Sequence, residues 1–112
     1  GAIIVSTPQE VALLDVKRGI KMFDKLGVKI LGLVNNMSHF IGGDGKKYNI
    51  FGEGGVKKTA DEFQKEYLGE IPIVSEVGKC GDNGKPIVEN NPNNEVSKIY
   101  TSIATKIKNI YL

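Results

Sequence analysis

The residues best suited to hold a ligand stand between Ile30 and Ser38, where an apolar run ends in two asparagines, a methionine and a serine. A short apolar run closed by polar residues is typical of a strand buried on both faces of a parallel sheet. In open α/β sheets, ligands bind at the carboxyl ends of the strands. Asn35, Asn36 and Ser38 would therefore offer hydrogen-bonding groups at such an edge, although paired asparagines also fit a simple turn of the chain.

The composition gives little support for a catalytic triad, a thiolate metal site or a phosphate-binding loop. His39 and Cys80 are the single histidine and the single cysteine, so the chain offers no convincing catalytic triad, no internal disulfide and no site of several thiolates. Cys80 fits a small buried hydrophobic residue, and His39 beside Phe40 fits a structural role. No Gly-x-x-x-x-Gly-Lys-Ser/Thr phosphate loop occurs, and no strand ends in a metal-binding aspartate. We therefore assign no catalytic residue and no metal ligand.

Charge and hydropathy narrow the range of partners. The 112 residues carry a formal net charge of +2, from 15 basic and 13 acidic side chains, which is too small for an electrostatic nucleic-acid footprint. No apolar run approaches the roughly 18 residues that would span a bilayer, and the start of the chain lacks the pattern of a signal peptide. We expect no nucleic-acid or membrane partner, and a location in the cytoplasm or an organelle matrix.

A βαβ unit would position the asparagines. Ala2 to Val5 is an apolar, β-branched strand, and the hydroxyls and proline that follow it are a sound helix start. An apolar stripe predicts a helix from Pro8 to about Leu26, which Gly27 ends. Residues 28–34 then form the second strand, after a right-handed crossover.

The rest of the chain adds a hairpin, a third strand and two more helices. Glycine, aromatic and helical spacing predict a hairpin at 39–51, a helix at 56–67, a strand at 68–73, mostly loop at 75–94 with a short turn near 76–80, and a last helix at 95–111. Composition and length predict one α/β domain over residues 1–112, with a parallel sheet of residues 2–6, 28–35 and 68–73. Two crossovers would cover both faces only if the strand order reverses, so we expect an uncovered apolar patch or strand edge.

Five motifs follow one another along nearly all of the chain: Ser6-Thr7-Pro8-Gln9, Asn36-Met37-Ser38, Ile50-Phe51-Gly52-Glu53-Gly54-Gly55, Leu68-Gly69-Glu70-Ile71-Pro72 and Asp82-Asn83-Gly84-Lys85-Pro86-Ile87-Val88. In combination this series resembles the carboxyl-terminal part of the Mrp/ApbC family of P-loop ATPases. That family carries and inserts iron-sulfur clusters and includes the nucleotide-binding-protein-like relatives of eukaryotes. The resemblance implies the carboxyl-terminal portion of a P-loop NTPase (Rossmann-like) fold, and a fragment of a larger ATPase domain.

The resemblance also implies one side of an ATP site. Asn36 would recognise the adenine base, because an amide places a donor and an acceptor on one planar group. Pro72 and the backbone of Ile73 and Val74 would form the wall of the pocket beside the base. The family usually has an aspartate where Val74 stands. The phosphate loop, and with it bound Mg, would belong only to the full-length protein, so this chain alone would be inactive.

Two functions remain open at this stage. In the first, the chain belongs to an Mrp-type ATPase that serves iron-sulfur client proteins, as a homodimer or together with a missing amino-terminal half. The family usually carries a Cys-x-x-Cys pair in the hairpin, but here the equivalent residues, Ile41 to Gly45, contain no cysteine, so no bound cluster is predicted. In the second, the chain is a free-standing α/β interaction module without catalytic activity.

Overall fold

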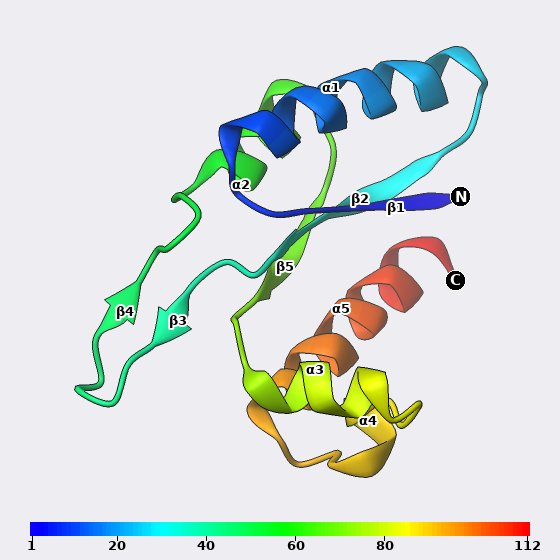
Figure 1. Ribbon diagram of the computed structural model, residues 1–112. Helices are drawn as coiled ribbons and strands as arrows, with labels where there is room; N and C mark the ends of the chain where they lie inside the picture. The colour runs from blue at the N-terminus through cyan, green and yellow to red at the C-terminus, as the bar shows by residue number, and fades with distance from the viewer.

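A three-stranded parallel sheet forms the centre of the computed structural model, which describes all residues from 1 to 112. Its strands lie in the order β1 (Ala2–Ser6), β2 (Ile30–Asn36) and β5 (Tyr67–Ile71), so β2 is the middle strand (Figure 1). Both pairings are parallel, and the α/β fold class predicted from the sequence is confirmed.

Two helices cover one face of this sheet. They are α1 (Glu10–Lys25), which follows β1, and α2 (Gly55–Glu62), which precedes β5. Because the strand order does not reverse, right-handed crossovers place both helices on the same side. The core between them and the sheet contains six buried residues: Val16, Ile20, Ile30, Leu33, Val56 and Ala60.

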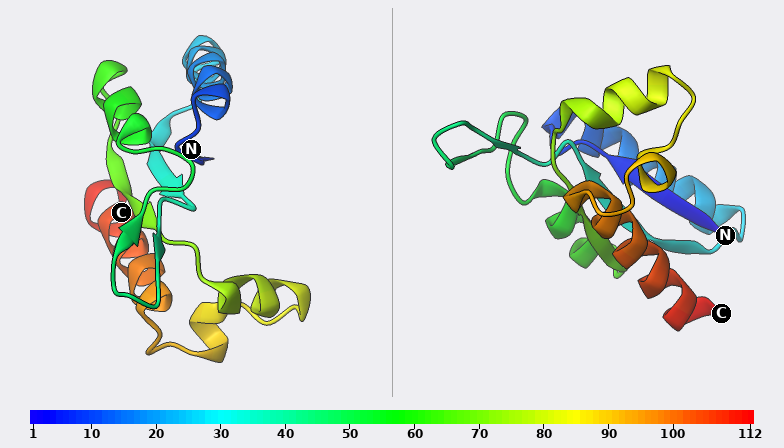
Figure 2. Two further views of the ribbon diagram at one scale, coloured as in Figure 1. Left: turned by 60° about the vertical axis from the view of Figure 1, so that its left-hand side comes forward. Right: turned by 90° about the horizontal axis from the view of Figure 1, so that it is seen from below.

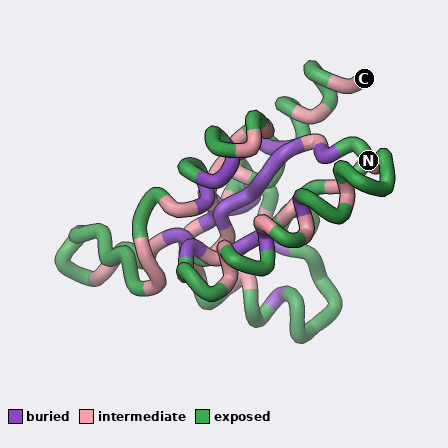
Figure 3. The backbone as a smooth tube through the Cα atoms, turned by 90° about the horizontal axis from the view of Figure 1, so that it is seen from above, coloured by how far each residue is buried: buried purple, intermediate pink, exposed green.

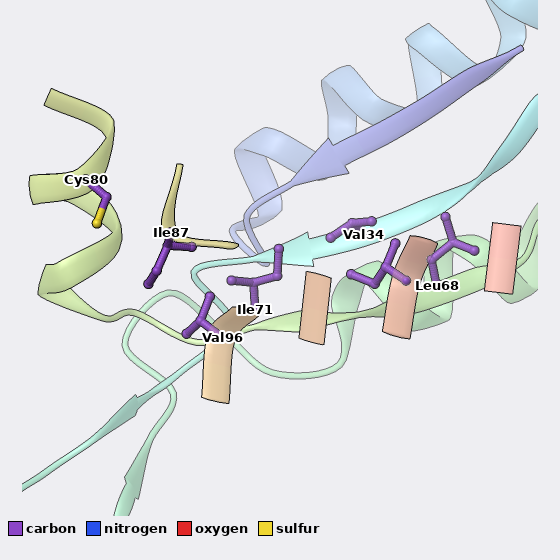
Figure 4. Packing of buried hydrophobic residues seen from close by; sticks show 7 residues of the cluster. Val34, Leu68, Ile71, Cys80, Ile87 and Val96 are labelled. Carbon is purple, nitrogen blue, oxygen red and sulfur yellow. The ribbon is translucent and has the colours of Figure 1, made fainter. Parts of the chain in front are cut away.

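Three helices follow the last strand: α3 (Ser75–Asp82), α4 (Ile87–Asn90) and α5 (Glu95–Tyr111). On the other face of the sheet α5 packs against β5, while α4 packs against α5 and α3 against α4. A second core cluster joins them to β2 and β5, and Figure 4 shows its packing; its members are Val34, Leu68, Ile71, Cys80, Ile87, Val96 and Ile103. The expectation that only a reversed strand order could cover both faces is therefore wrong for β5 and β2, which α5 covers, whereas the expected uncovered apolar surface is present on β1.

The segment 75–94 is mostly helical, where the sequence analysis expected mostly loop. Its glycines and asparagines have weak helix propensity, but burial of Cys80 and Ile87 against α5 outweighs that preference. The Asn94 side chain donates to Glu76 (2.9 Å) and accepts from the Val96 backbone N–H (2.9 Å). This asparagine therefore ties α3 to the first turn of α5.

The helix predicted over 56–67 is shorter than expected. α2 ends at Glu62, and Gln64 adopts the left-handed conformation with φ 55°. The Lys65 N–H donates back to the Ala60 carbonyl at 2.8 Å, which closes the helix end. Tyr67 consequently lies in β5, where it packs against the core under α1 and α2.

A hairpin projects from the carboxyl edge of the sheet. β3 (Phe40–Ile41) pairs antiparallel with β4 (Lys47–Tyr48), which confirms the predicted hairpin, and Figure 2 shows how far it extends from the other elements. Asp44 holds the turn by accepting from the Lys46 N–H (2.9 Å) and from the Tyr48 hydroxyl. The side chains of both short strands are exposed, whereas β2 is almost wholly buried (Figure 3).

β1 is left partly uncovered. It pairs with β2 on one side only, and α5 packs mainly against β5 at the opposite edge. Ile3 and Val5, on the α5 face of the sheet, are 42% and 58% exposed. The strand thus presents both an unpaired edge and an apolar face. No helix of the chain has the length and apolar character needed to cross a membrane.

Candidate functional site

The four candidate site residues meet at the carboxyl edge of the sheet. Asn36 is the last residue of β2, and its register partner in β5 is Ile71. Pro72, Ile73 and Val74 follow Ile71 directly in the chain, and all four candidate residues are partly exposed. The topology therefore brings the asparagine and the proposed wall to the ends of two neighbouring strands.

Hydrogen bonds join the two segments that leave these strand ends. The backbone N–H of Ser38 donates to the Ile71 carbonyl at 3.0 Å, and the Ser38 hydroxyl donates to the same oxygen at 3.2 Å. One step farther on, the Ile73 N–H donates to the His39 carbonyl at 2.7 Å. The separation between Asn36 and residues 72–74 is therefore fixed by contacts within the chain.

The backbone of the wall is only partly free for a ligand. The Ile73 N–H is already bonded to His39, and the Val74 carbonyl accepts from the Val77 N–H at 3.2 Å in the first turn of α3. Val74 also packs against the core under α5. The Ile73 N–H and the Val74 carbonyl are therefore already occupied by bonds within the chain.

The two adjacent asparagines lie in different environments. Side chains alternate along a strand, so Asn36 shares the α5 face with Val34, whereas Asn35 shares the α1 face with Leu33. Asn35 is 5% exposed, and its Oδ1 has no hydrogen-bond partner. None of the side-chain hydrogen bonds at this edge involves the Asn36 amide, which remains free to pair with a ligand.

Asn35 and Ser38 are thus buried, against the expectation that both would be presented at the ligand edge. Asn35 faces the core side of β5, where Tyr67 packs. Burial raises the pKa of Tyr67, a hydrogen bond from Asn35 partly offsets that rise, and the negative charge of Glu70 adds to it.

Glu70 is a residue to which the sequence analysis gave no role of its own. Its Oε1 lies 3.8 Å from His39 Nδ1 and 3.8 Å from Lys47 Nζ, so it links β5 to both sides of the hairpin. The signal in the sequence was weak, because partners more than 20 residues away leave no local spacing pattern. The hairpin base is therefore attached to the same edge as the candidate site.

A separate hollow of about 760 Å³ lies between the start of α1 and α2, and none of the four candidate residues lines it. Gly55, at its wall, packs so closely that a Cβ there would lie 2.5 Å from Leu13 Cδ1. Gly54 caps α2 in the left-handed conformation, φ 74°. Close packing and backbone conformation thus account for these glycines.

The chain matches a family model over residues 1–108. The model belongs to the ParA group and is described as NUBPL iron-transfer P-loop NTPase. The chain belongs to this family. The resemblance to Mrp/ApbC proteins seen in the motifs is confirmed by this match.

Curated relatives carry names from the same family. An "Iron-sulfur cluster carrier protein" of Aquifex aeolicus is 43% identical over 111 residues, which is 98% of this chain and 30% of the relative. An "Iron-sulfur protein required for NADH dehydrogenase, mitochondrial" of Arabidopsis thaliana is 45% identical over 108 residues, 96% of this chain and 34% of the relative. The chain thus spans about a third of the length of these family members.

Solved structures give the same fold. A nucleotide-binding protein of Archaeoglobus fulgidus, in complex with ADP, is 38% identical and covers 76% of this chain and 35% of its own, with a TM-score of 0.65. The cell division ATPase MinD of Pyrococcus furiosus covers 98% of this chain and 44% of its own, with a TM-score of 0.76 at 20% identity. This chain therefore shares the architecture of part of a P-loop NTPase domain.

Proposed function

We propose that this chain forms the adenine side of the nucleotide site in an Mrp-type, ATP-binding iron-sulfur cluster carrier. Three observations support the proposal: the family match, the ADP bound by the Archaeoglobus relative, and the position of Asn36 beside Pro72 to Val74. The position of Asn36 carries the most weight, because this residue ends β2 beside Ile71, from which residues 72–74 continue, and all four residues are partly exposed.

The residues present fit an adenine base. The Asn36 amide can donate to a ring nitrogen and accept from the exocyclic amine, and the Ile73 carbonyl offers a second acceptor for that amine. Pro72 and Val74 supply apolar contact for the ring. The chain brings together no group of three His, Cys, Asp or Glu side chains able to hold a metal ion. In this proposal the phosphate loop and Mg, which supply charge stabilisation for phosphoryl transfer, lie outside residues 1–112.

The iron-sulfur cluster would be cargo of the complete protein. Cys80 is the only thiol and is 6% exposed beneath α4, and the hairpin carries no cysteine, so we assign no cluster ligand to this chain. The partners we propose are a nucleotide, iron-sulfur client proteins, and either a second copy or an amino-terminal half. The mitochondrial label of the Arabidopsis relative favours an organelle matrix, with the cytoplasm as the alternative.

The test is a titration of the ¹⁵N-labelled chain with ATP and adenosine, followed by amide chemical shifts. Without phosphate contacts we expect millimolar affinity, about −4 kcal/mol, with shifts concentrated at residues 36 and 73–74 and no ATP hydrolysis. Asn36→Ala should remove those shifts, and Asn93→Ala, which changes an exposed asparagine, should leave them. Micromolar binding that persists unchanged in Asn36→Ala would refute the site. Complete absence of binding would favour the interaction module.

A further inference from the structure

Ser38 is buried more deeply than its place in a connection would require. It is 3% exposed, although it lies between exposed Met37 and the protruding hairpin. Met37 adopts the left-handed conformation, with φ 52°, which turns the chain back so that Ser38 faces β5. Both the N–H and the hydroxyl of Ser38 then converge on one atom, the carbonyl oxygen of Ile71.

The hydroxyl also connects this carbonyl to His39. Ser38 Oγ lies 2.8 Å from His39 Nδ1, and when the hydroxyl donates its single proton to the Ile71 oxygen at 3.2 Å, Oγ accepts from the ring. The Nδ1–H tautomer of His39 satisfies this arrangement. The result is a chain of two hydrogen bonds, from the His39 ring through the Ser38 hydroxyl to β5.

This connection lies between the two parts of the base site. Asn36 is two residues before Ser38, and Pro72 follows Ile71 directly. Two backbone bonds also join the segments, from the Ser38 N–H to the Ile71 carbonyl and, one step farther from the sheet, from the Ile73 N–H to the His39 carbonyl. Groups that recognise a ligand by hydrogen bonds must be held to within about 0.5 Å, so the distance from Asn36 to its wall needs such a brace.

We propose that Ser38 is a positioning residue that sets the gap between Asn36 and residues 72–74, and with it the selectivity of the site for adenine. The inference rests on the proposed function and deepens it. Ser38 itself does not touch the base. Removal of its hydroxyl loosens the brace, so that Asn36 loses its fixed direction and discriminates less between adenosine and inosine, which has an oxygen in place of the amine.

The experiment titrates the full chain with adenosine and with inosine, and it measures amide exchange at Ile73 and Val34. In Ser38→Ala we expect adenosine affinity to fall about tenfold, the value of one well-placed hydrogen bond, and the preference over inosine to shrink. Exchange should accelerate at Ile73 but not at Val34 in the middle strand. Ser38→Thr, which keeps the hydroxyl, should restore the affinity.

Ser97→Ala is the matched control. Its side chain is fully buried, and its hydroxyl donates to the carbonyls of Ile87 and Asn91 rather than to the two segments that carry the candidate residues, so its loss should leave adenosine affinity unchanged. If wild type and Ser38→Ala bind adenosine equally while Asn36→Ala does not bind it, the role of Ser38 is overturned and the proposed function stands. A wild-type chain that binds no adenosine overturns both. Equal loss in Ser38→Ala and Ser38→Thr would assign the effect to side-chain size and also overturn the role.

If Ser38→Ala does not fold, the wild-type chain still tests the brace. Adenosine should then slow exchange at Ile73 more than at Val34, because a ligand held by both segments tightens the bonds between them. Equal slowing at both amides would overturn the inference.

Discussion

Leu68 occupies the space that a side chain at Gly32 would need. A Cβ atom on Gly32 would lie 2.5 Å from Leu68 Cγ and 2.8 Å from its Cδ1. Leu68 is in turn 1% exposed and belongs to the core under α5. The absence of a side chain in the middle of β2 thus allows Leu68 of β5 to close over that strand.

This contact predicts a coupled pair of substitutions. Gly32→Ala should destabilise the chain by about 1–3 kcal/mol through overpacking, and Leu68→Ala by about 2–5 kcal/mol through the cavity it leaves. The double variant should lose less than the two effects added, because the new methyl group fills part of that cavity. Urea denaturation of the four proteins measures the coupling, and strictly additive losses would disprove the contact.

The end of α5 is attached to β2 through Tyr111. Its hydroxyl donates to the Leu31 carbonyl at 3.0 Å, and the Lys29 ammonium lies 4.4 Å from its ring centre. Tyr111→Phe, which removes only the hydroxyl, should cost about 1 kcal/mol of unfolding free energy. Tyr100→Phe serves as the control, since Tyr100 is exposed on the same helix. Equal unfolding midpoints for both variants would contradict this attachment.

The hairpin turn should be ordered between two pH limits. The hydrogen bond from Tyr48 holds the pKa of Asp44 below its ordinary 3.8, and the same bond raises the pKa of Tyr48 above its ordinary 10.0. A lowered acid pKa contributes stability that is present above pH 3.8 and is lost as pH falls through the lower value. A raised phenol pKa contributes stability that is present below pH 10.0 and is lost as pH rises beyond it.

Amide and ring chemical shifts of Lys46 and Tyr48 across this pH range measure the prediction. Tyr48→Phe should remove the high-pH transition and bring the pKa of Asp44 closer to its ordinary value. An Asp44 carboxyl that titrates identically in Tyr48→Phe and wild type would exclude the hydrogen bond.

The uncovered strand β1 should make the isolated chain associate with a second copy. Its free edge and the exposed Ile3 and Val5 offer both backbone groups and apolar surface to another strand. Light scattering should therefore show concentration-dependent growth in mass. Val5→Lys should suppress it, whereas Val88→Lys, at an exposed residue of α4, should not. A particle that stays monomeric at every concentration would argue against this association.

The spacing of apolar residues was sufficient to predict those helices and strands that bury a single, continuous apolar surface. The spacing of apolar residues in α1 and α5 and the unbroken apolar run of β2 each reflect a single dominant contact surface, so the pattern is local. α3 and α4 lack such a stripe. Their helical state depends on packing against α5, far along the chain, and on the asparagine contacts of Glu76, which no local window contains.

The position of Asn36 at a strand end was predictable from the sequence, but its surroundings were not. The end of an apolar strand indicated Asn36 correctly as an edge residue, because the carboxyl ends of parallel strands share one edge. Asn35 and Asn36 point to opposite faces of the sheet. Which of them is buried depends on which helices cover each face of β2, and the sequence alone does not show this. The brace at Ser38 joins residues 33 positions apart, and it leaves no signal in a single sequence.

The two faces of the sheet close at different times during synthesis. The chain makes α1, β2 and α2 before β5. The core between α1, α2 and the sheet can therefore form as soon as β5 emerges from the ribosome. The other face stays open until α5 has been made, which leaves Val34, Leu68 and Ile71 exposed to the surrounding medium for the intervening residues. A nascent chain stalled near residue 94 should therefore be a better substrate for a holding chaperone than one in which α5 has also emerged, since translation at about 5–20 residues per second sets the length of that interval.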